Sequence, residues 1–508
     1  MNTFRTWYEK RILTLLRRLL DALERYWIVV IIMAGLIVAA ITFLIGIRQS
    51  VWFDEAYSLT LAKLSVNQLV ALTSVDVHPP LYYLLLKVWG SLFGWNDGAY
   101  RALGALIGGV LVVVSALLVK RLFGRLMMLV VVPILVMAPF LIRYDFEIRM
   151  YALAALLGII GTYILTLAVT VKRRQWLVWG IYALIVAISM YTVYYVALLW
   201  IAHVVWLVYW SRTHHQPIFR QPWLRAYTVA ALLFLPWMPT FISQLTNGAL
   251  AGIVQAMTID NLVSIISFSF LYRPTWQLGA VGSFVMVVVL VGLTILSVTA
   301  YKASTQHEKR YLTLFVSILI IPIVVVALIS LIRPFYVERY LVPILPAGYI
   351  LTGLVIVIAA RRRPMWASVG GIFLFGVLVA GVVQLAEVGN YNFQRLQIPT
   401  VNQAAASIGT CSSGDAILAA DPYVATELQQ YLPASCKLVF YDQSDVLRGG
   451  YAPLSNSNRQ IKSLTDLNYL TTIHYVYYGQ PQLSPMANFS VGSEKVYGAL
   501  RIQTWQKR

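Results

Sequence analysis

The chain has 508 residues, of which 59% are hydrophobic and 12% are charged, and its formal net charge is +19. Soluble domains carry roughly 25% charged residues, so this composition excludes a soluble enzyme and indicates a polytopic membrane protein. The basic residues cluster in short segments between apolar runs, as the positive-inside rule describes. The charge therefore needs no nucleic-acid partner to explain it.

The first segment, residues 1–26, has apolar residues at helical spacing and Arg and Lys on the other face. This pattern predicts an interfacial amphipathic helix on the cytoplasmic side. Residues 27–385 then form the predicted membrane domain. The apolar stretch 176–210 is too long for one span, so we divide it into two at Tyr191–Tyr194. About eleven apolar runs of spanning character follow one another in this domain: 27–46, 100–119, 126–142, 150–170, 176–190, 193–210, 226–242, 278–300, 311–332, 341–360 and 367–385.

Six connecting or terminal segments together hold 21 Lys or Arg residues. With eleven spans, all six fall on the same side of the membrane, so we expect a cytoplasmic N-terminus in the plasma (inner) membrane. The other side then receives the C-terminal tail, residues 386–508, and five loops: 47–99 (the first), 143–150 (the second), a short turn at 191–192 (the third), 243–277 (the fourth) and 333–340 (the fifth). Most of the unusual polar residues lie in these extracytoplasmic loops.

The first outer loop opens with VWFDEAYSLT, in which Asp54 and Glu55 follow closely on the first span. Ionisable groups close to the hydrocarbon are costly to place, and they commonly have a function. The pair fits either a solvated acidic loop or a catalytic pair of carboxylates at the membrane surface. The residues that share this side of the membrane decide between the two.

The same loop continues with SVDVHPPLYY, in which Pro79 forces an extended backbone on His78. Pro80 can open a helix over residues 81–93, which is apolar but too short to span. His78 would then be held rigidly at the mouth of a pocket. The alternative is a plain His-Pro-Pro turn.

Two further outer loops are rich in charge. The second one places Arg143, Asp145, Glu147, Arg149 and Tyr151 within nine residues, and a helical backbone would pair Asp145 with Arg149. This loop fits either a self-neutralising cluster of ion pairs or a set of ligand-binding cations.

The fifth outer loop carries Arg333, Glu338, Arg339 and Tyr340. An arginine at the start of a span can simply extend its side chain to the lipid headgroups. Together with the acidic pair and His78, however, these arginines fit a site for an anionic lipid phosphate. A phosphate leaving group needs cations rather than a strong acid, and Asp54 or Glu55 could be the base for an attacking hydroxyl.

The tail, residues 386–508, alternates between helical and strand patterns and predicts a small α/β domain with a parallel sheet. The expected helices are 400–409 and 424–432, and the expected strands are 416–420, 437–441 and 472–479. Cys411 and Cys436 each precede a predicted strand, so parallel neighbours would bring them together as a disulfide.

Four motifs in this order, DEAYSL, DVHPPLYYLLLKVW, YDFEIRMYAL and VERYLVPILP, resemble the bacterial protein-mannosyltransferase-like enzymes of glycosyltransferase family 39. The resemblance covers about residues 27–360 and implies the C-type glycosyltransferase fold. It also implies an inverting transfer of a hexosyl or pentosyl group from a polyprenyl-phosphate carrier at the extracytoplasmic face. The acceptor would be a hydroxyl of a protein, a lipid or a cell-envelope glycan.

The resemblance also implies roles for individual residues. Asp54 stands at the family's base and Glu55 at its acidic partner, while Arg149, Tyr151, Arg339 and Tyr340 match the residues that meet the carrier phosphate. His78 stands where related lipid A aminoarabinose transferases have a phosphate-contacting lysine. Val77 replaces a glutamate associated with a metal, and Asp76 lies one residue away, so a divalent metal cofactor stays open.

Two alternatives use the same residues differently. A transporter or flippase for lipid-linked sugars would place ionisable groups near the membrane midplane, whereas this chain concentrates them at the outer ends of its spans. A glycan polymerase or ligase with lipid-pyrophosphate donors would use the outer arginines equally well. The acidic pair with His-Pro-Pro favours the polyprenyl-phosphate transferase.

Overall fold

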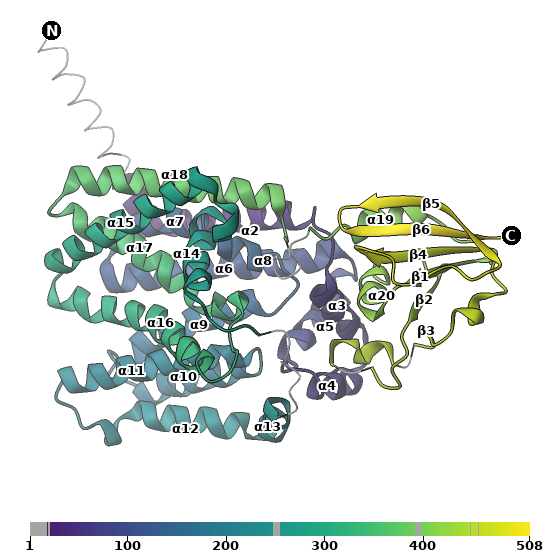
Figure 1. Cartoon of the computed structure of the whole chain (residues 1–508). Helices are drawn as coiled ribbons and strands as arrows, with labels where there is room; N and C mark the ends of the chain where they lie inside the picture. Colours follow the sequence, from purple (N-terminus) through teal and green to yellow (C-terminus); the bar gives the residue numbers. More distant parts are fainter. Residues whose placement is uncertain (1–17, 19–20, 247–253, 392–397, 448, 456) are drawn as a thin grey trace, which may run out of the picture.

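The computed structural model describes residues 18, 21–246, 254–391, 398–447, 449–455 and 457–508. These residues form a helical bundle and a small sheet domain, with a layer of short helices between them (Figure 1). The amphipathic helix expected at residues 1–26 lies mostly outside the described part of the chain, and that prediction stays untested.

Within the described residues, nine helices or joined helices are long and apolar enough to cross a membrane. They are α2 (Trp27–Gly46), α6 (Asp97–Phe123), α9 (Tyr151–Ala168), η1 with α11 (Tyr194–Thr213), α12 to α13 (Pro222–Thr246), α15 (Gly279–Ala303), α16 (Gln306–Ser330), η5 with α17 (Glu338–Ala360) and α18 (Pro364–Val388). The prediction of a polytopic helical membrane protein is confirmed.

The two remaining predicted runs are also helical but less simple. α7 (Arg125–Val136) and α8 (Pro139–Asp145) meet at a bend of 63° and count together as a tenth span. α10 (Gln175–Met190) has 16 residues, or about 24 Å of helix, which is shorter than the hydrocarbon core. The predicted division at Tyr191–Tyr194 is confirmed, because α10 ends just before it and α11 (Ala197–Thr213) follows.

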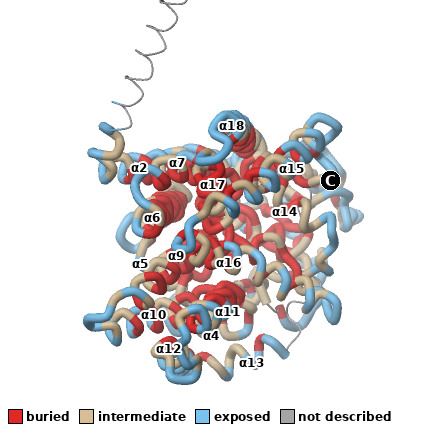
Figure 2. Tube along the Cα trace, turned by 90° about the vertical axis from the view of Figure 1, so that its left-hand side faces the viewer, coloured by how far each residue is buried: buried red, intermediate tan, exposed pale blue. Residues whose placement is uncertain are grey.

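The helices differ in how far they are enclosed (Figure 2). α9 and the joined η5–α17 span (Glu338–Ala360, of which α17 is Leu345–Ala360) are central, with 72% and 78% of their most apolar stretch buried, whereas only 17% of that stretch is buried in α15. α2 and α6 approach closely where Gly35 faces Gly109. A side chain at Gly109 would not fit there, since its Cβ would lie 2.6 Å from the carbonyl oxygen of Gly35. Small residues at this crossing therefore allow the two backbones to touch, as is common between membrane helices.

Three helices cover the end of the bundle that faces the sheet domain: α3 (Phe53–Lys63), α4 (Val66–Ser74) and α5 (Leu81–Phe93) (Figure 1). The sequence predicted α5 but neither of the other two. Ser65 and Gln68 form a capping box at the start of α4, and this S-x-x-Q signal is visible in the sequence. The first outer loop is thus a compact helical layer.

The basic segments lie at the opposite end of the bundle. α6 begins with Asp97 near the sheet domain and ends with Lys120 and Arg121 in its last turn. Arg361 follows the end of α17 and pairs with Glu308 at 2.7 Å. This arrangement matches the predicted separation of basic segments from polar outer loops. The direction of the chain in a membrane stays a prediction.

The sheet domain has six strands in the order β3-β2-β1-β4-β6-β5. They are β1 (Asp415–Ala419), β2 (Lys437–Tyr441), β3 (Gln460–Ile461), β4 (Thr472–Tyr478), β5 (Phe489–Tyr497) and β6 (Leu500–Lys507). The predicted strands correspond to β1, β2 and β4, which pair in parallel. The antiparallel β5–β6 hairpin was not predicted, so the sheet is mixed and not purely parallel.

Two helices of this domain match the predicted helical stretches: α19 (Val401–Ile408) and α20 (Pro422–Leu428). The other described elements are α14 (Ile259–Leu271) and the short 3-10 helices η2 (Ile218–Arg220), η3 (Leu235–Trp237), η4 (Thr275–Gln277), η6 (Gly449–Leu454) and η7 (Leu464–Leu467). α20 packs against α3 and thereby joins the sheet domain to the helical layer.

Cys411 precedes β1 and Cys436 precedes β2, and a disulfide joins them across 25 positions, so the closed loop contains β1 and α20. A loop of this length is expected to contribute about 3 kcal/mol to the free energy of unfolding. Replacing both cysteines by serine should therefore speed amide hydrogen exchange across β1 and β2. Exchange in α9 and α17 serves as the internal control, and unchanged exchange in both strands would contradict the expected contribution.

Candidate active site

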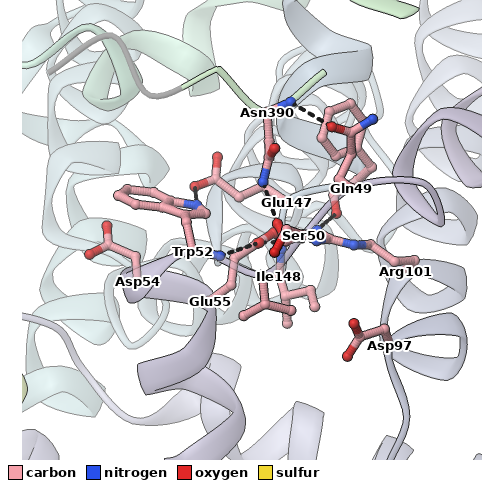
Figure 3. A network of polar contacts seen from close by, with 12 residues as sticks. Gln49, Ser50, Trp52, Asp54, Glu55, Asp97, Arg101, Glu147, Ile148 and Asn390 are labelled. Atoms are coloured by element: carbon pink, nitrogen blue, oxygen red, sulfur yellow. Dashed lines mark hydrogen bonds and ion pairs between the residues drawn. The ribbon is translucent and has the colours of Figure 1, made fainter. Parts of the chain in front are cut away.

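Asp54 and Glu55 are neighbours in the first turn of α3, but their side chains point in different directions (Figure 3). Successive residues of an α-helix are about 100° apart around its axis, because a turn takes 3.6 residues. Glu55 points into the bundle toward Arg101, whereas Asp54 points away from that cluster. The acidic pair is therefore divided between two environments.

Glu55 is completely buried and fully engaged. Arg101 of α6 forms an ion pair with it through two nitrogens, one of them at 3.0 Å from Oε2. The backbone N–H of Ile148 donates to Oε1 at 2.9 Å, and that of Trp52 donates to Oε2 at 3.3 Å. Glu55 thus ties the start of α3 to α6 and to the loop between α8 and α9.

Trp52 connects this cluster to a second buried ion pair. Its indole N–H donates to Glu147 at 3.1 Å, and Glu147 also accepts from Arg143 at 2.8 Å. Burial raises the pKa of Glu147, although the charge of Arg143 opposes this. The indole ring of Trp52 also faces the guanidinium of Arg339 at 5.8 Å. Trp52 therefore contacts both the start of α3, through its backbone, and Arg339, through its ring.

Asp54 is less enclosed, with 18% of its side chain exposed. Nη2 of Arg339 lies 3.6 Å from Oδ2 of Asp54. Arg339 lies in η5 (Glu338–Ile344), at the start of a span, where its side chain is turned inward and largely buried. Its side chain is therefore not extended toward the lipid headgroups, and it places a positive charge beside the accessible carboxylate.

Arg149 approaches α3 from the loop before α9. Its Nη1 donates to the hydroxyl of Tyr83 at 3.0 Å, to Oγ of Ser58 at 3.2 Å and to the backbone carbonyl of Asp54 at 3.4 Å. These acceptors are uncharged, so Arg149 is held in place without being neutralised by them. A guanidinium held in this way is suited to binding an anion.

Several donors around Asp54 are buried without a hydrogen-bond partner in the described part of the chain. They are Nε of Arg149, Nε of Arg339 and the hydroxyl of Tyr151. Tyr151 lies within electrostatic reach of both arginines. Buried donors without acceptors are costly, so this cluster indicates a place where an anionic ligand supplies the missing acceptors.

Tyr340 completes the cluster from the side of η5. It stacks on Tyr195 with ring centroids 3.5 Å apart, and it lies within electrostatic reach of Arg339, Asp54 and Arg149. The stack links η5 to η1 (Tyr194–Val196), which precedes α11. Residues from four parts of the chain thus surround Asp54.

His78 lies on the α5 side of this cluster, where Asp76 faces it. Nδ1 of His78 is 3.6 Å from Oδ2 of Asp76, and both side chains are buried. Burial lowers the pKa of His78, and the nearby charge of Arg149 adds to this effect while Asp76 opposes it. Burial also acts to raise the pKa of Asp76, but His78 and Arg149 together lower it below its usual value. Burial and the charge of Arg149 therefore both act against the charged form of His78.

No group of three His, Cys, Asp or Glu side chains within the described residues is arranged to hold a metal ion. Val77 offers no ligand at the position that the resemblance assigns to a metal-associated glutamate, and the carboxylate of Asp76 faces His78. These described residues do not fit the divalent metal site that the sequence left open.

The structure brings together all the residues proposed from the sequence, namely Asp54, Glu55, His78, Arg149, Tyr151, Arg339 and Tyr340, with Glu55 behind the accessible site. The helical pair suggested for Asp145 and Arg149 does not form among the described residues, because α8 ends at Asp145. The pair that forms instead is Arg143 with Glu147.

Arg101, the main partner of Glu55, was not predicted from the sequence. It lies within an otherwise apolar run, and an arginine in such a run needs a partner or a water-filled surrounding. That signal could have identified it. Asn390 was also missed; its amide nitrogen donates to the carbonyl of Ser50 at 2.7 Å just before α3 (Figure 3). Both residues fix the segment that carries Asp54.

The helical bundle has the C-type glycosyltransferase fold, as comparisons with a family model and with solved structures show. The model of the family described as dolichyl-phosphate-mannose-protein mannosyltransferase matches residues 77–240. The match covers about a third of the chain and confirms the resemblance seen in the sequence. Comparison with curated proteins gives no match.

Two solved structures share the overall fold. ArnT from Cupriavidus metallidurans, bound to undecaprenyl phosphate, superposes with a TM-score of 0.59 at 13% identity, covering 94% of this chain and 98% of ArnT. The oligosaccharyltransferase AglB from Archaeoglobus fulgidus gives a TM-score of 0.50 at 10% identity, covering 89% of this chain and 70% of AglB. At these identities the similarity establishes the fold and not the activity.

Proposed function

We propose that the chain is an inverting glycosyltransferase that moves a sugar from a polyprenyl-phosphate carrier to an acceptor hydroxyl at the outer face of the plasma (inner) membrane. The observation that carries this proposal is the accessible carboxylate of Asp54 between Arg339 and Arg149, whose buried Nε donors lack acceptors among the described residues. Of the related folds, ArnT was solved with undecaprenyl phosphate and AglB with a dolichol-phosphate.

In the proposed reaction Asp54 accepts the proton of the acceptor hydroxyl. The hydroxyl oxygen forms a bond to the anomeric carbon of the sugar, and the bond from that carbon to the phosphate oxygen breaks. The electron pair leaves with the carrier phosphate, whose charge Arg149 and Arg339 stabilise. Attack opposite the leaving group inverts the anomeric centre, and the products are a glycoside and the carrier monophosphate.

Glu55 has a different proposed role, because its buried carboxylate is bonded to Arg101 and to two backbone amides. It positions the first turn of α3, and the proton transfer falls to Asp54. In this proposal the anionic carrier phosphate favours the imidazolium form of His78, which then donates from Nδ1 to Asp76 and from Nε2 to the phosphate.

The geometry gives less support to a transporter. The charged residues of the site come from the ends of spans and from the loops between them, as with Arg101 near the start of α6 and Arg339 at the start of η5. His203, inside α11, is hydrogen-bonded at both ring nitrogens, to Thr162 at 3.1 Å and to Tyr182 at 2.9 Å. Such a satisfied network is typical of a structural core.

The proposal is tested with purified protein in lipid nanodiscs. Labelled polyprenyl-monophosphate and polyprenyl-pyrophosphate sugars are supplied together with protein, lipid and cell-envelope glycan fractions as acceptors. We expect acceptor-dependent release of polyprenyl phosphate and a product whose anomeric configuration, measured by NMR, is opposite to that of the donor. Transfer from pyrophosphate donors alone would instead support the polymerase or ligase, and tight donor binding without transfer to any acceptor would support the transporter.

The arginines should determine donor affinity. Replacing Arg149 or Arg339 by methionine removes a charge-assisted hydrogen bond, which corresponds to a loss of about ten- to a hundredfold in affinity for polyprenyl phosphate. Arg333→Met is the matched control, because Arg333 lies in the same outer loop as Arg339 but is exposed. Binding is measured by microscale thermophoresis, and equal losses in all three variants would contradict the specific role of the two site arginines.

A further inference from the structure

Tyr431 links the sheet domain to the segment just before α3. Its hydroxyl accepts the backbone N–H of Val51 at 2.7 Å and donates to Oδ2 of Asp97 at 2.9 Å. Tyr431 follows α20 in the sheet domain, whereas Asp97 is the first residue of α6. One hydroxyl therefore connects three parts of the chain within a few residues of Asp54.

Asp97 and Arg101 lie four residues apart in α6 and so share one face of that helix. Arg101 holds Glu55 directly, and Asp97 holds Val51 through Tyr431. Figure 3 shows Asp97 beside this cluster. Helix α6 thus fixes the start of α3 at two points, one on each side of Asp54 in the sequence, and one of these points requires the sheet domain.

The face of α3 that is turned toward the sheet domain is held as well. The ring of Phe53 stacks on Tyr423 of α20, with centroids 4.6 Å apart and planes 9° apart. The side-chain amide of Gln430 donates to Thr60 at 3.1 Å and to the carbonyl of Ala56 at 3.3 Å. Both sequence neighbours of Asp54 are therefore fixed, Phe53 by the sheet domain and Glu55 by the bundle.

We propose that Tyr431 is a positioning residue for sugar transfer, which holds Asp54 at the reacting centre by joining Asp97 to the backbone of Val51. This inference rests on the proposed function and extends it, because it makes the sheet domain part of the catalytic arrangement. The domain then contributes to the rate of transfer through the placement of α3, in addition to any contact it makes with the acceptor.

The chemistry of the contact supports this role. Val51 is completely buried, so its N–H would lose its acceptor if the hydroxyl were removed. A buried donor without a partner is costly, and the segment would shift to relieve it. Burial, and the neighbouring charge of Asp97, raise the pKa of Tyr431, so the hydroxyl keeps its proton and remains a donor to Asp97.

The test is Tyr431→Phe in the full-length protein, which keeps the ring and removes only the hydroxyl. We expect kcat for sugar transfer to fall about tenfold, the effect of one lost hydrogen bond on a transition state, with KM for the polyprenyl-phosphate sugar unchanged. Hydrogen exchange should become faster in the peptide containing Val51. Tyr475→Phe is the matched control, because that hydroxyl accepts the backbone N–H groups of Gln482 and Leu483 within the sheet domain.

The outcomes separate this inference from the proposed function. If the wild type transfers sugar and Tyr431→Phe has the same kcat, the positioning role is wrong and the proposed function stands. If Tyr475→Phe lowers kcat equally, the effect is a general loosening of the sheet domain, which also overturns the role. We expect Asp97→Asn to lower kcat when it is introduced into the wild type but not when it is introduced into the Tyr431→Phe variant, which would show that the two residues act as one unit. No transfer by the wild type would contradict the proposed function itself.

Discussion

Asp54→Asn should reduce sugar transfer by about 10²- to 10⁴-fold, the usual effect of removing a general base. The amide has nearly the same shape as the carboxylate but cannot take the proton of the acceptor hydroxyl. Donor binding should be retained, because Arg149 keeps its bonds to Ser58 and Tyr83. The measurement is the single-turnover rate with donor already bound, together with the dissociation constant for polyprenyl phosphate.

Asp260→Asn is the matched control for this substitution. Asp260 lies in the first turn of α14, is exposed and accepts a hydrogen bond from Thr275. We expect its transfer rate to equal that of the wild type. Equal rates for Asp54→Asn and the wild type would remove Asp54 from the chemistry, and loss of donor binding in Asp54→Asn would assign it to the binding site instead.

Arg101→Met should be the most destabilising single substitution in the site. It leaves Glu55 buried without its positive partner, and breaking a buried ion pair from one side costs about 3–5 kcal/mol. Glu55 is 0% exposed, so water cannot replace the arginine without opening the core. The loss is measured as a decrease in the free energy of unfolding, and transfer should fall with it because α3 loses its anchor.

Arg361→Met provides the comparison at the other end of the bundle. Arg361 pairs with Glu308 at 2.7 Å, but 43% of its side chain is exposed. Exposed pairs contribute about 0–1 kcal/mol, so this variant should be close to the wild type in stability and in transfer. If Arg101→Met and Arg361→Met lowered the free energy of unfolding by similar amounts, burial would not determine how much the Glu55–Arg101 ion pair contributes to stability.

The membrane helices were predicted well from the sequence because the surrounding lipid hydrocarbon dictates their composition. A hydrocarbon environment requires long apolar helices with satisfied backbones, and the positions of these helices follow directly from apolar length. The bend between α7 and α8 was not predicted. A proline often marks the place where a helix bends, but Pro133 lies within α7, and the helix breaks only after Val136. Helix presence was therefore easier to predict than helix direction.

The candidate site was found from the sequence because its charges stand out against an apolar chain. What the sequence did not reveal was the different environment of each carboxylate. Adjacent residues such as Asp54 and Glu55 look equivalent until a helix turns them apart, and α3 itself was not predicted. Arg101 was overlooked because it was counted within an apolar run and not as a buried charge in need of a partner.

The sheet domain was predicted in part for a similar reason. β1, β2 and β4 are short buried strands with a clear apolar signal, whereas β5 is an exposed edge strand with a bulge between Val491 and Glu494. Polar edge strands carry little apolar periodicity. The contact of Tyr431 with Val51 joins residues 380 positions apart, and no local pattern in the sequence predicts it.

The most direct test of the account is a cryo-electron microscopy structure of the protein with polyprenyl phosphate bound. We expect the phosphate within hydrogen-bond reach of the guanidinium groups of Arg149 and Arg339, with the carboxylate of Asp54 facing the side where the anomeric carbon would lie. A phosphate bound away from both arginines, or separated from Asp54 by the protein, would contradict the assignment of this cluster as the active site.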